Sequence, residues 1–222
     1  MKKNYKTRAV RYYDPKLGMP ITQPRKIKTL LSRLALPLLS LVSREKSIKM
    51  KLVPIDDERV IIALLHAKGR VLDVGCGANN FIRSYGNGVG VDVFPWEGCD
   101  IVVKDASKLP FPKGDFDTVS FLACLNHIAN RKEALIEANR VLKDDGQILI
   151  TMITPRWGKF IHWIRFSNDP DHKTRHINHG SEQLGINSVD MQHLLAEAGF
   201  CINKRVRFVF GLNSLYVAKK IH

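Results

Sequence analysis

The chain has 222 residues, 45% of them hydrophobic, which is enough to bury one substantial core. Its formal charge of +14 is uneven: residues 1–50 hold 13 Lys/Arg against 2 Asp/Glu, whereas residues 51–222 hold 22 against 19. The nearly neutral body gives no support for a broad nucleic-acid-binding face, and four scattered cysteines without a CxxC pair argue against a zinc site or a disulfide framework.

The first 50 residues are predicted to form a basic N-terminal arm. Residues 1–26 carry several turn-forming residues, so we expect them to be extended or partly disordered. Residues 27–42 are rich in leucine and predict a helix with a break or kink at Pro37. This helix either packs on the rest of the domain or lies on a membrane surface, because it is too short to span a bilayer. The expected location is cytoplasmic, with peripheral membrane contact as an option.

From Asp56 onward, helix and strand patterns alternate. Acidic residues 56–58 begin a helix whose apolar residues repeat at helical spacing. The following predicted elements are strand 70–74, a loop and helix over 75–85, strand 89–93, short strand 101–103, strand 116–122, helix 130–142 and strand 147–153. Apolar strands separated by helices predict an α/β fold with a parallel sheet covered on both faces. Ligands of such sheets bind at the carboxyl ends of the strands.

The C-terminal tail has a different pattern. A polar, histidine-rich segment over 155–185 precedes a predicted helix, 188–198, and two predicted strands, 201–210 and 213–219. The main domain is therefore expected to cover residues 51–222.

Two glycines follow the first strand, in the segment VLDVGCGANN. Gly75 and Gly77 let the backbone turn sharply and approach a ligand closely, because neither has a Cβ. They open a helix whose amino end offers free N–H groups. A dinucleotide-binding loop would have a third glycine where this chain has Asn80. The two glycines alone are also consistent with a purely structural turn.

Two carboxylates make a nucleoside ligand the better interpretation. Asp92 ends the second strand, where a carboxylate can accept hydrogen bonds from both hydroxyls of a ribose. Asp105 follows the third strand and can accept from an adenine amino group.

Four segments, VLDVGCG, VGVDVF, DASKLPFPKGDFDTV and ANRVLKDDGQILIT, resemble the successive motifs of the class I S-adenosylmethionine-dependent methyltransferases. The resemblance is greatest to the small-molecule group often called type 11. It covers residues 56–154 closely and the tail in outline. It implies a three-layer Rossmann-like fold with a mostly parallel seven-stranded sheet, and methyl transfer to a small-molecule acceptor by in-line displacement. A sulfonium cofactor has no pyrophosphate, so a third glycine is unnecessary.

The resemblance also implies where the cofactor binds. It assigns the methionine part to Asp73, Gly75 and Gly77, the ribose to Asp92, the adenine to Asp105 and Ala106, and the transferring methyl to residues 122–127, which include Cys124.

The chain departs from this pattern after the second strand. Only the segment VFPWEGCD separates Asp92 from Ile101, which is too short for the helix that normally joins two parallel strands. Either that helix is reduced to a turn or the third strand is displaced. We expect the leucine-rich helix 27–42, or Trp96 itself, to cover the sheet surface left bare.

Acceptor and catalytic residues are less strongly indicated. His127 is the best candidate for a general base, although its imidazole can equally bond a backbone group. Asn126 either positions the acceptor or caps the next helix, and capping is the favoured role. The 155–185 segment is expected to form an acceptor pocket or lid, in which His172 and His176 would contact the acceptor. A metal site there is a weaker alternative, and we assign none.

Two other functions compete with small-molecule methyl transfer. One is an RNA or protein methyltransferase that grips its substrate with the basic arm. The other is a non-catalytic cofactor-binding module that acts through the arm on a partner or a membrane.

Overall fold

The computed structural model describes residues 10–14, 19–23, 55–153, 155, 185–208 and 212–221. The helices are α3 (Ile55–Leu64), α4 (Asn80–Tyr85), η1 (Leu125–His127, a 3₁₀ turn), α5 (Arg131–Val141) and α8 (Ser188–Glu197). The strands are β1 (Val10–Asp14), β2 (Met19–Gln23), β3 (Val71–Val74), β4 (Gly88–Asp92), β5 (Ile101–Val102), β6 (Phe116–Leu122), β7 (Leu142–Ile153), β8 (Phe200–Phe208) and β9 (Asn213–Lys220).

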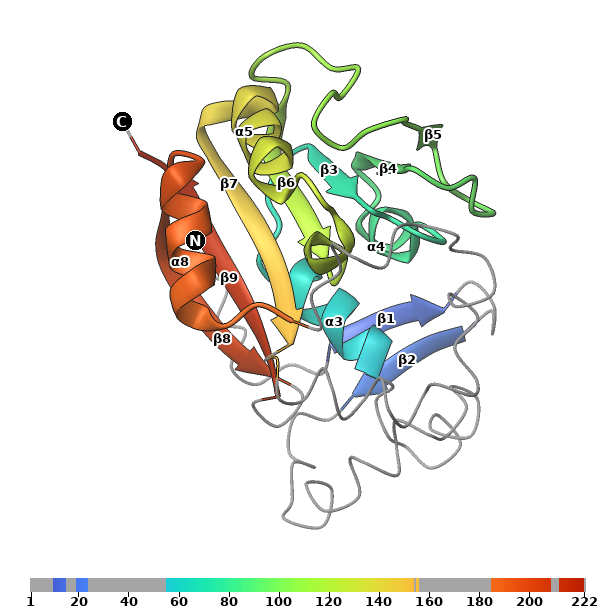
Figure 1. Cartoon of the computed structure of the whole chain (residues 1–222). Helices are drawn as coiled ribbons and strands as arrows, with labels where there is room; N and C mark the ends of the chain where they lie inside the picture. Colours follow the sequence, from blue (N-terminus) through green and yellow to red (C-terminus); the bar gives the residue numbers. More distant parts are fainter. Residues whose placement is uncertain are drawn as a thin grey trace.

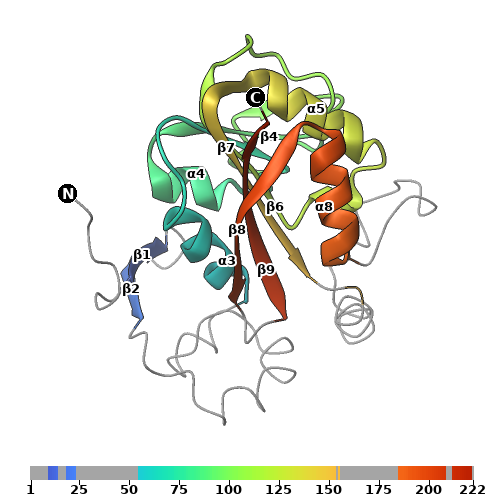
Figure 2. The same ribbon diagram turned by 90° about the vertical axis from the view of Figure 1, so that its left-hand side faces the viewer.

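A seven-stranded sheet with the order β5-β4-β3-β6-β7-β9-β8 runs through the main domain (Figure 1). The first five strands in this order, β5, β4, β3, β6 and β7, are parallel to one another, whereas β9 is antiparallel to both of its neighbours. Helices α3 and α4 lie on one face of this sheet, and helices α5 and α8 lie on the other (Figure 2). The mostly parallel, three-layer α/β fold predicted from the sequence is confirmed.

The central strands are apolar because both faces of the sheet are covered. All four residues of β3 are buried, and β6 and β7 contribute Phe121 and Ile150 to the main core, both fully buried. This rigid centre fixes the carboxyl ends of β3, β4 and β6, where the polar residues singled out by the sequence lie.

The connection between β4 and β5 has no helix. Residues 93–100 form turns, and β5 still pairs in parallel with β4, with Val91 opposite Ile101. The shortened crossover is therefore confirmed, and of the two alternatives the helix reduced to a turn is the correct one. Trp96 packs against Phe94 with ring centroids 4.7 Å apart. The other proposed cover, the leucine-rich segment 27–42, lies outside the described residues.

Three predicted segments differ from the structure. The N-terminal segment contains an antiparallel hairpin of β1 and β2, which the prediction of an extended or partly disordered arm misses. Strand β7 begins at Leu142 rather than at residue 147, because Leu142 pairs with Phe116 and the strand continues through Asp144-Asp145-Gly146, which reads as a turn. Residue 93 lies outside β4.

None of the helices within the described ranges has the length and apolar character needed to cross a membrane.

Candidate cofactor site

The glycine loop turns sharply at the end of β3. Gly75 and Gly77 have φ values of 73° and 53°, in the left-handed region that favours glycine. The N–H groups of Gly75 and Cys76 donate to the Val91 carbonyl at 2.8 and 3.1 Å, so the loop is held against the end of β4. A Cβ on Gly75 would lie 2.5 Å from the Cβ of Cys124. Only glycine fits this position.

Asp92 lies beside this loop at the end of β4. Its Oδ2 accepts from the Gly77 N–H at 2.9 Å, and its Oδ1 accepts from the Phe94 N–H at 3.0 Å. Two backbone donors on different oxygens orient the carboxylate, and each oxygen keeps lone pairs for further donors. Such a group can accept hydrogen bonds from a pair of neighbouring hydroxyls.

Asp73 is buried within β3 and is the most perturbed carboxyl of the site. Its Oδ1 accepts from the Ser120 hydroxyl at 2.7 Å, which favours the ionised form. Burial has the larger effect, and with the nearby charge of Asp92 it raises the pKa of Asp73 to about 7. A cation placed next to Asp73 would stabilise its charged form.

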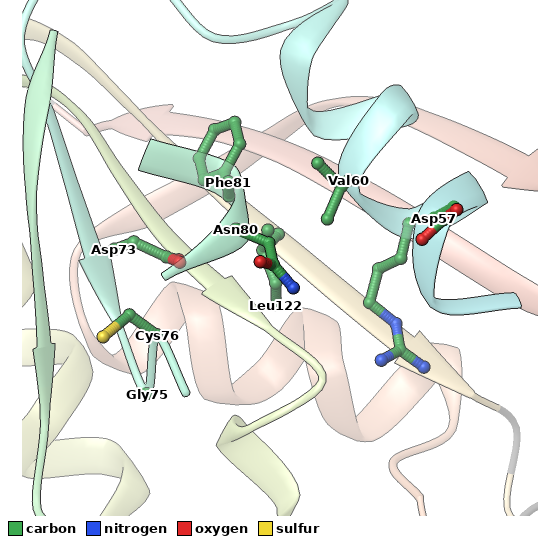
Figure 3. A pocket seen from close by; sticks show the side chains of 9 residues that line it. Asp57, Val60, Asp73, Gly75, Cys76, Asn80, Phe81 and Leu122 are labelled. Atoms are coloured by element: carbon green, nitrogen blue, oxygen red, sulfur yellow. The ribbon is translucent and has the colours of Figure 1, made fainter. Parts of the chain in front are cut away.

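A cavity of about 210 Å³ opens next to Asp73. It lies between the glycine loop and the amino ends of α3 and α4, and it is lined by Asp57, Arg59, Val60, Asp73, Gly75, Cys76, Asn80, Phe81 and Leu122. Figure 3 shows Asp73 and Cys76 on one side of the cavity and Asp57 on the other. The cavity thus presents carboxylates, one guanidinium and apolar walls to a small polar molecule.

The sequence did not identify the α3 residues Asp57 and Arg59 as part of this site. The sequence pattern indicates only that Asp57 belongs to an acidic helix start, yet this residue is just 5% exposed. The usable signal is the position of the helix directly before the glycine-loop strand, which places its first turn over the carboxyl end of that strand. Asn80, which replaces a third glycine, also lines the cavity.

Asp105 lies in the loop after β5, where its Oδ1 accepts from the Ser107 N–H at 2.8 Å and from the Asn130 amide at 3.0 Å. These two hydrogen bonds hold the pKa of Asp105 below its usual range, so the group is charged near neutral pH. Ala106 is buried in the main core. Helix α5 fixes the rest of the loop, since Glu137 accepts from the Leu109 N–H at 2.8 Å.

The residues after β6 form a strained turn and a 3₁₀ helix. Ala123 has a φ of 57°, an uncommon conformation for a residue with a Cβ. It brings Cys124 under the glycine loop, where the thiol donates to the Val74 carbonyl at 2.9 Å. The Asn126 amide and His127 Nε2 lie 3.1 Å apart.

One sequence prediction in this turn is wrong. Asn126 does not cap the next helix, because it lies inside η1 and Asn130 occupies the N-cap of α5. His172, His176 and nearly all of the proposed lid at 155–185 lie outside the described residues.

Residues 25–203 match the methyltransferase-domain family, which is well over half of the chain. The chain belongs to this methyltransferase family. The class I S-adenosylmethionine-dependent group recognised from its motifs is confirmed, and so is the Rossmann-like fold.

Solved structures share the fold of this methyltransferase. A SAM-dependent methyltransferase of Thermotoga maritima, described as a possible histamine N-methyltransferase, superposes with a TM-score of 0.59 at 16% identity and covers 86% of this chain and 94% of its own. The 1,6-didemethyltoxoflavin-N1-methyltransferase of Burkholderia thailandensis, solved with 1,6-didemethyltoxoflavin and S-adenosylhomocysteine bound, gives 0.55 at 18% identity, covering 96% and 100%. At these identities the likeness shows the fold alone.

Curated relatives match part of this methyltransferase. An uncharacterized protein of Methanocaldococcus jannaschii is 36% identical over an alignment of 119 residues that covers 50% of this chain and 47% of the relative. A ubiquinone/menaquinone biosynthesis C-methyltransferase of Laribacter hongkongensis is 30% identical over an alignment of 108 residues that covers 40% of this chain and 44% of the relative. The chain thus spans less than half of either relative.

Proposed function

We propose that this protein transfers a methyl group from S-adenosylmethionine to a small-molecule acceptor. The observation that carries the proposal is the Asp92 carboxylate, held between the Gly77 and Phe94 N–H groups at the carboxyl end of the sheet. A carboxylate fixed beside a glycine loop suits a ribose, and the absence of a third glycine at position 80 suits a cofactor without a pyrophosphate.

The cavity next to Asp73 fits the amino-acid part of the same cofactor. Its walls carry the carboxyl groups of Asp73 and Asp57 and the positively charged guanidinium of Arg59. In our proposal the methionine ammonium lies near Asp73 and the methionine carboxylate near Arg59. Asp105 and Ala106 would then contact the adenine, on the far side of Asp92 from the cavity.

Two similar proteins support a small-molecule acceptor. One matched relative is a C-methyltransferase of quinone biosynthesis, and one structural neighbour holds a small heteroaromatic acceptor. In-line displacement depends on close, aligned contact between the acceptor and the methyl carbon in a site that excludes water. In our proposal Cys124 and Asn126 form part of the wall of such a site. His127 is our candidate for a base, needed only if the acceptor must lose a proton.

The function can be tested without knowing the acceptor. The purified chain is incubated with methyl-labelled S-adenosylmethionine and an extract fractionated into metabolites, lipids, RNA and protein. We expect the label in a metabolite or lipid fraction. Label in RNA or protein would instead support a macromolecular acceptor gripped by residues 1–50, and transfer to no fraction, despite cofactor binding, would support a non-catalytic module.

Asp73→Asn should remove a pH dependence from cofactor binding. In the wild-type protein Asp73 ionises near pH 7, so affinity for S-adenosylhomocysteine should rise about tenfold between pH 5.5 and pH 7.5 as the carboxylate forms next to the ligand ammonium. The asparagine keeps the oxygen that accepts from Ser120. Its affinity should be lower at pH 7.5 and nearly constant with pH in calorimetric titrations.

The thermal stability of the wild-type protein should fall as pH rises, in the opposite direction to its cofactor affinity. The pKa of Asp73 is raised on folding, so its protonated form favours the folded state and stability is lost as pH rises from about 4 to about 7. Asp73→Asn should therefore melt at a higher temperature than the wild type at pH 7.5. Equal pH profiles of binding for the two proteins would contradict the assignment of Asp73.

A further inference from the structure

We propose that Asn79 and Asp100 form a clamp that joins the glycine loop to the shortened β4–β5 connection and thereby positions Asp92 for the ribose of the cofactor. Both act as positioning residues, because their contacts are to other protein groups. The proposal rests on the proposed use of S-adenosylmethionine.

The clamp is a small, partly buried hydrogen-bond network in which Asn79 is buried and Asp100 is exposed. The Asn79 amide donates to Asp100 Oδ2 at 2.8 Å and to the Gly98 carbonyl at 3.0 Å. The same Oδ2 of Asp100 accepts from the Gly90 N–H at 2.7 Å. Asn79 is only 2% exposed. Three segments, the glycine loop, β4 and the 93–100 connection, thus meet at one carboxylate oxygen.

The backbone at Asn79 is strained in order to make these contacts. Its φ of 58° and ψ of 29° are left-handed, a conformation that glycine adopts far more easily. Asn79 also stands at the N-cap of α4, where asparagine normally accepts from the first backbone N–H groups, yet its side chain makes no such bond. The asparagine therefore serves the clamp and not the helix.

The neighbouring residues leave room for this arrangement. A Cβ on Gly90 would lie 2.2 Å from the Oδ1 of Asn79. A Cβ on Gly98, whose φ is +96°, would lie 2.3 Å from the Arg83 guanidinium. Glycine at position 90 therefore admits the Asn79 side chain, and glycine at 98 lets the connection lie against α4.

The clamp holds the two backbone segments that grip Asp92. Gly77, which donates to one oxygen of Asp92, is in the glycine loop two residues before Asn79. Phe94, which donates to the other oxygen, lies in the connection that Asn79 and Asp100 fix at Gly98. Parallel strands are normally joined by a helix that would hold this connection in place. Here the Asn79–Asp100 clamp supplies that restraint.

Two variants test the clamp. Asn79→Gly keeps the left-handed backbone and removes the amide, so it should fold. Asp100→Ala removes the oxygen that accepts from both the Asn79 amide and the Gly90 N–H, so it breaks the clamp from the other side. Asn139→Ala is the matched control, because the Asn139 amide also donates to two carbonyls, those of Ala198 and Gly199, at the far side of the domain.

The measurement is the binding of S-adenosylhomocysteine and of its 2′-deoxy analogue by calorimetry. For the wild type we expect the natural compound to bind about tenfold more tightly than the analogue. In both clamp variants the natural compound should lose about tenfold in affinity, and this preference should fall close to one. The control should keep the wild-type preference even if its melting temperature falls.

The outcomes separate the two proposals. Clamp variants that keep the wild-type preference for the ribose hydroxyl would overturn the clamp, whatever their stability. A folded wild-type protein that binds neither compound would overturn the proposed function itself. If Asn79→Gly does not fold, Asp100→Ala decides alone.

Discussion

Replacing Gly75 with alanine should abolish cofactor binding and lower the free energy of unfolding by about 2–5 kcal/mol. Two costs combine at this position. The φ of 73° is strained for any residue with a Cβ, and the added methyl would lie 2.5 Å from the Cβ and 2.8 Å from the Sγ of Cys124. The glycine loop and the turn after β6 would be forced apart, although in our proposal both contact the same ligand. Urea unfolding and calorimetry with S-adenosylhomocysteine measure the two effects.

Gly114→Ala is the matched control for this prediction. Its φ of 73° equals that of Gly75, but nothing lies within 4 Å of the added Cβ, and the residue lies just before the start of β6, outside the proposed cofactor site. The loss of stability should be about 1–2 kcal/mol, with binding retained. Adding Cys124→Gly to the Gly75→Ala protein removes both atoms that the new methyl meets, so it should recover part of the stability. If the two single alanine variants behave alike, the contact with Cys124 is not what requires Gly75.

Most of the sheet could be predicted from the sequence, because its strands are short apolar runs with clear ends. Strand β6 begins and ends where the sequence predicts, at Phe116 and Leu122. The hairpin of β1 and β2 was missed because basic residues and turn signals conceal the two short strands. The early start of β7 could not be seen, since it depends on the pairing of Leu142 with Phe116, a contact between residues far apart in sequence.

The candidate site could be predicted where a residue acts through its position near the end of a strand. Asp73 lies one residue before the end of β3, Asp92 ends β4 and Asp105 follows β5, and parallel strands bring such residues together at their carboxyl ends. Asp57 and Arg59 escaped notice because a helix start is usually solvated, and only packing shows that this one covers the loop. The contacts of Asn79 with Asp100 depend on two left-handed or glycine-dependent turns, which have no signal in residue spacing.

Asp92→Ala should reduce affinity for S-adenosylmethionine about 100-fold or more. The carboxylate uses one oxygen for the Gly77 N–H and the other for the Phe94 N–H, and in our proposal both oxygens also accept from the ribose hydroxyls. Hydrogen bonds to a charged group are worth about 1.5–3 kcal/mol each, so the loss of two to the ligand alone accounts for this factor. Alanine further leaves both backbone donors without their acceptor.

Asp92→Asn should fall between the wild type and alanine, because it offers a single oxygen and must face one of the two backbone donors with an NH₂ group. Asp117→Asn is the matched control. Asp117 also accepts from a backbone N–H, that of Arg70 at 2.8 Å, but it lies near the start of β6, at the amino ends of the parallel strands and so opposite the proposed cofactor site. That variant should bind the cofactor like the wild type. Should it lose as much affinity as Asp92→Asn, the effect would come from a general loss of structure, and the ribose would have to be held elsewhere.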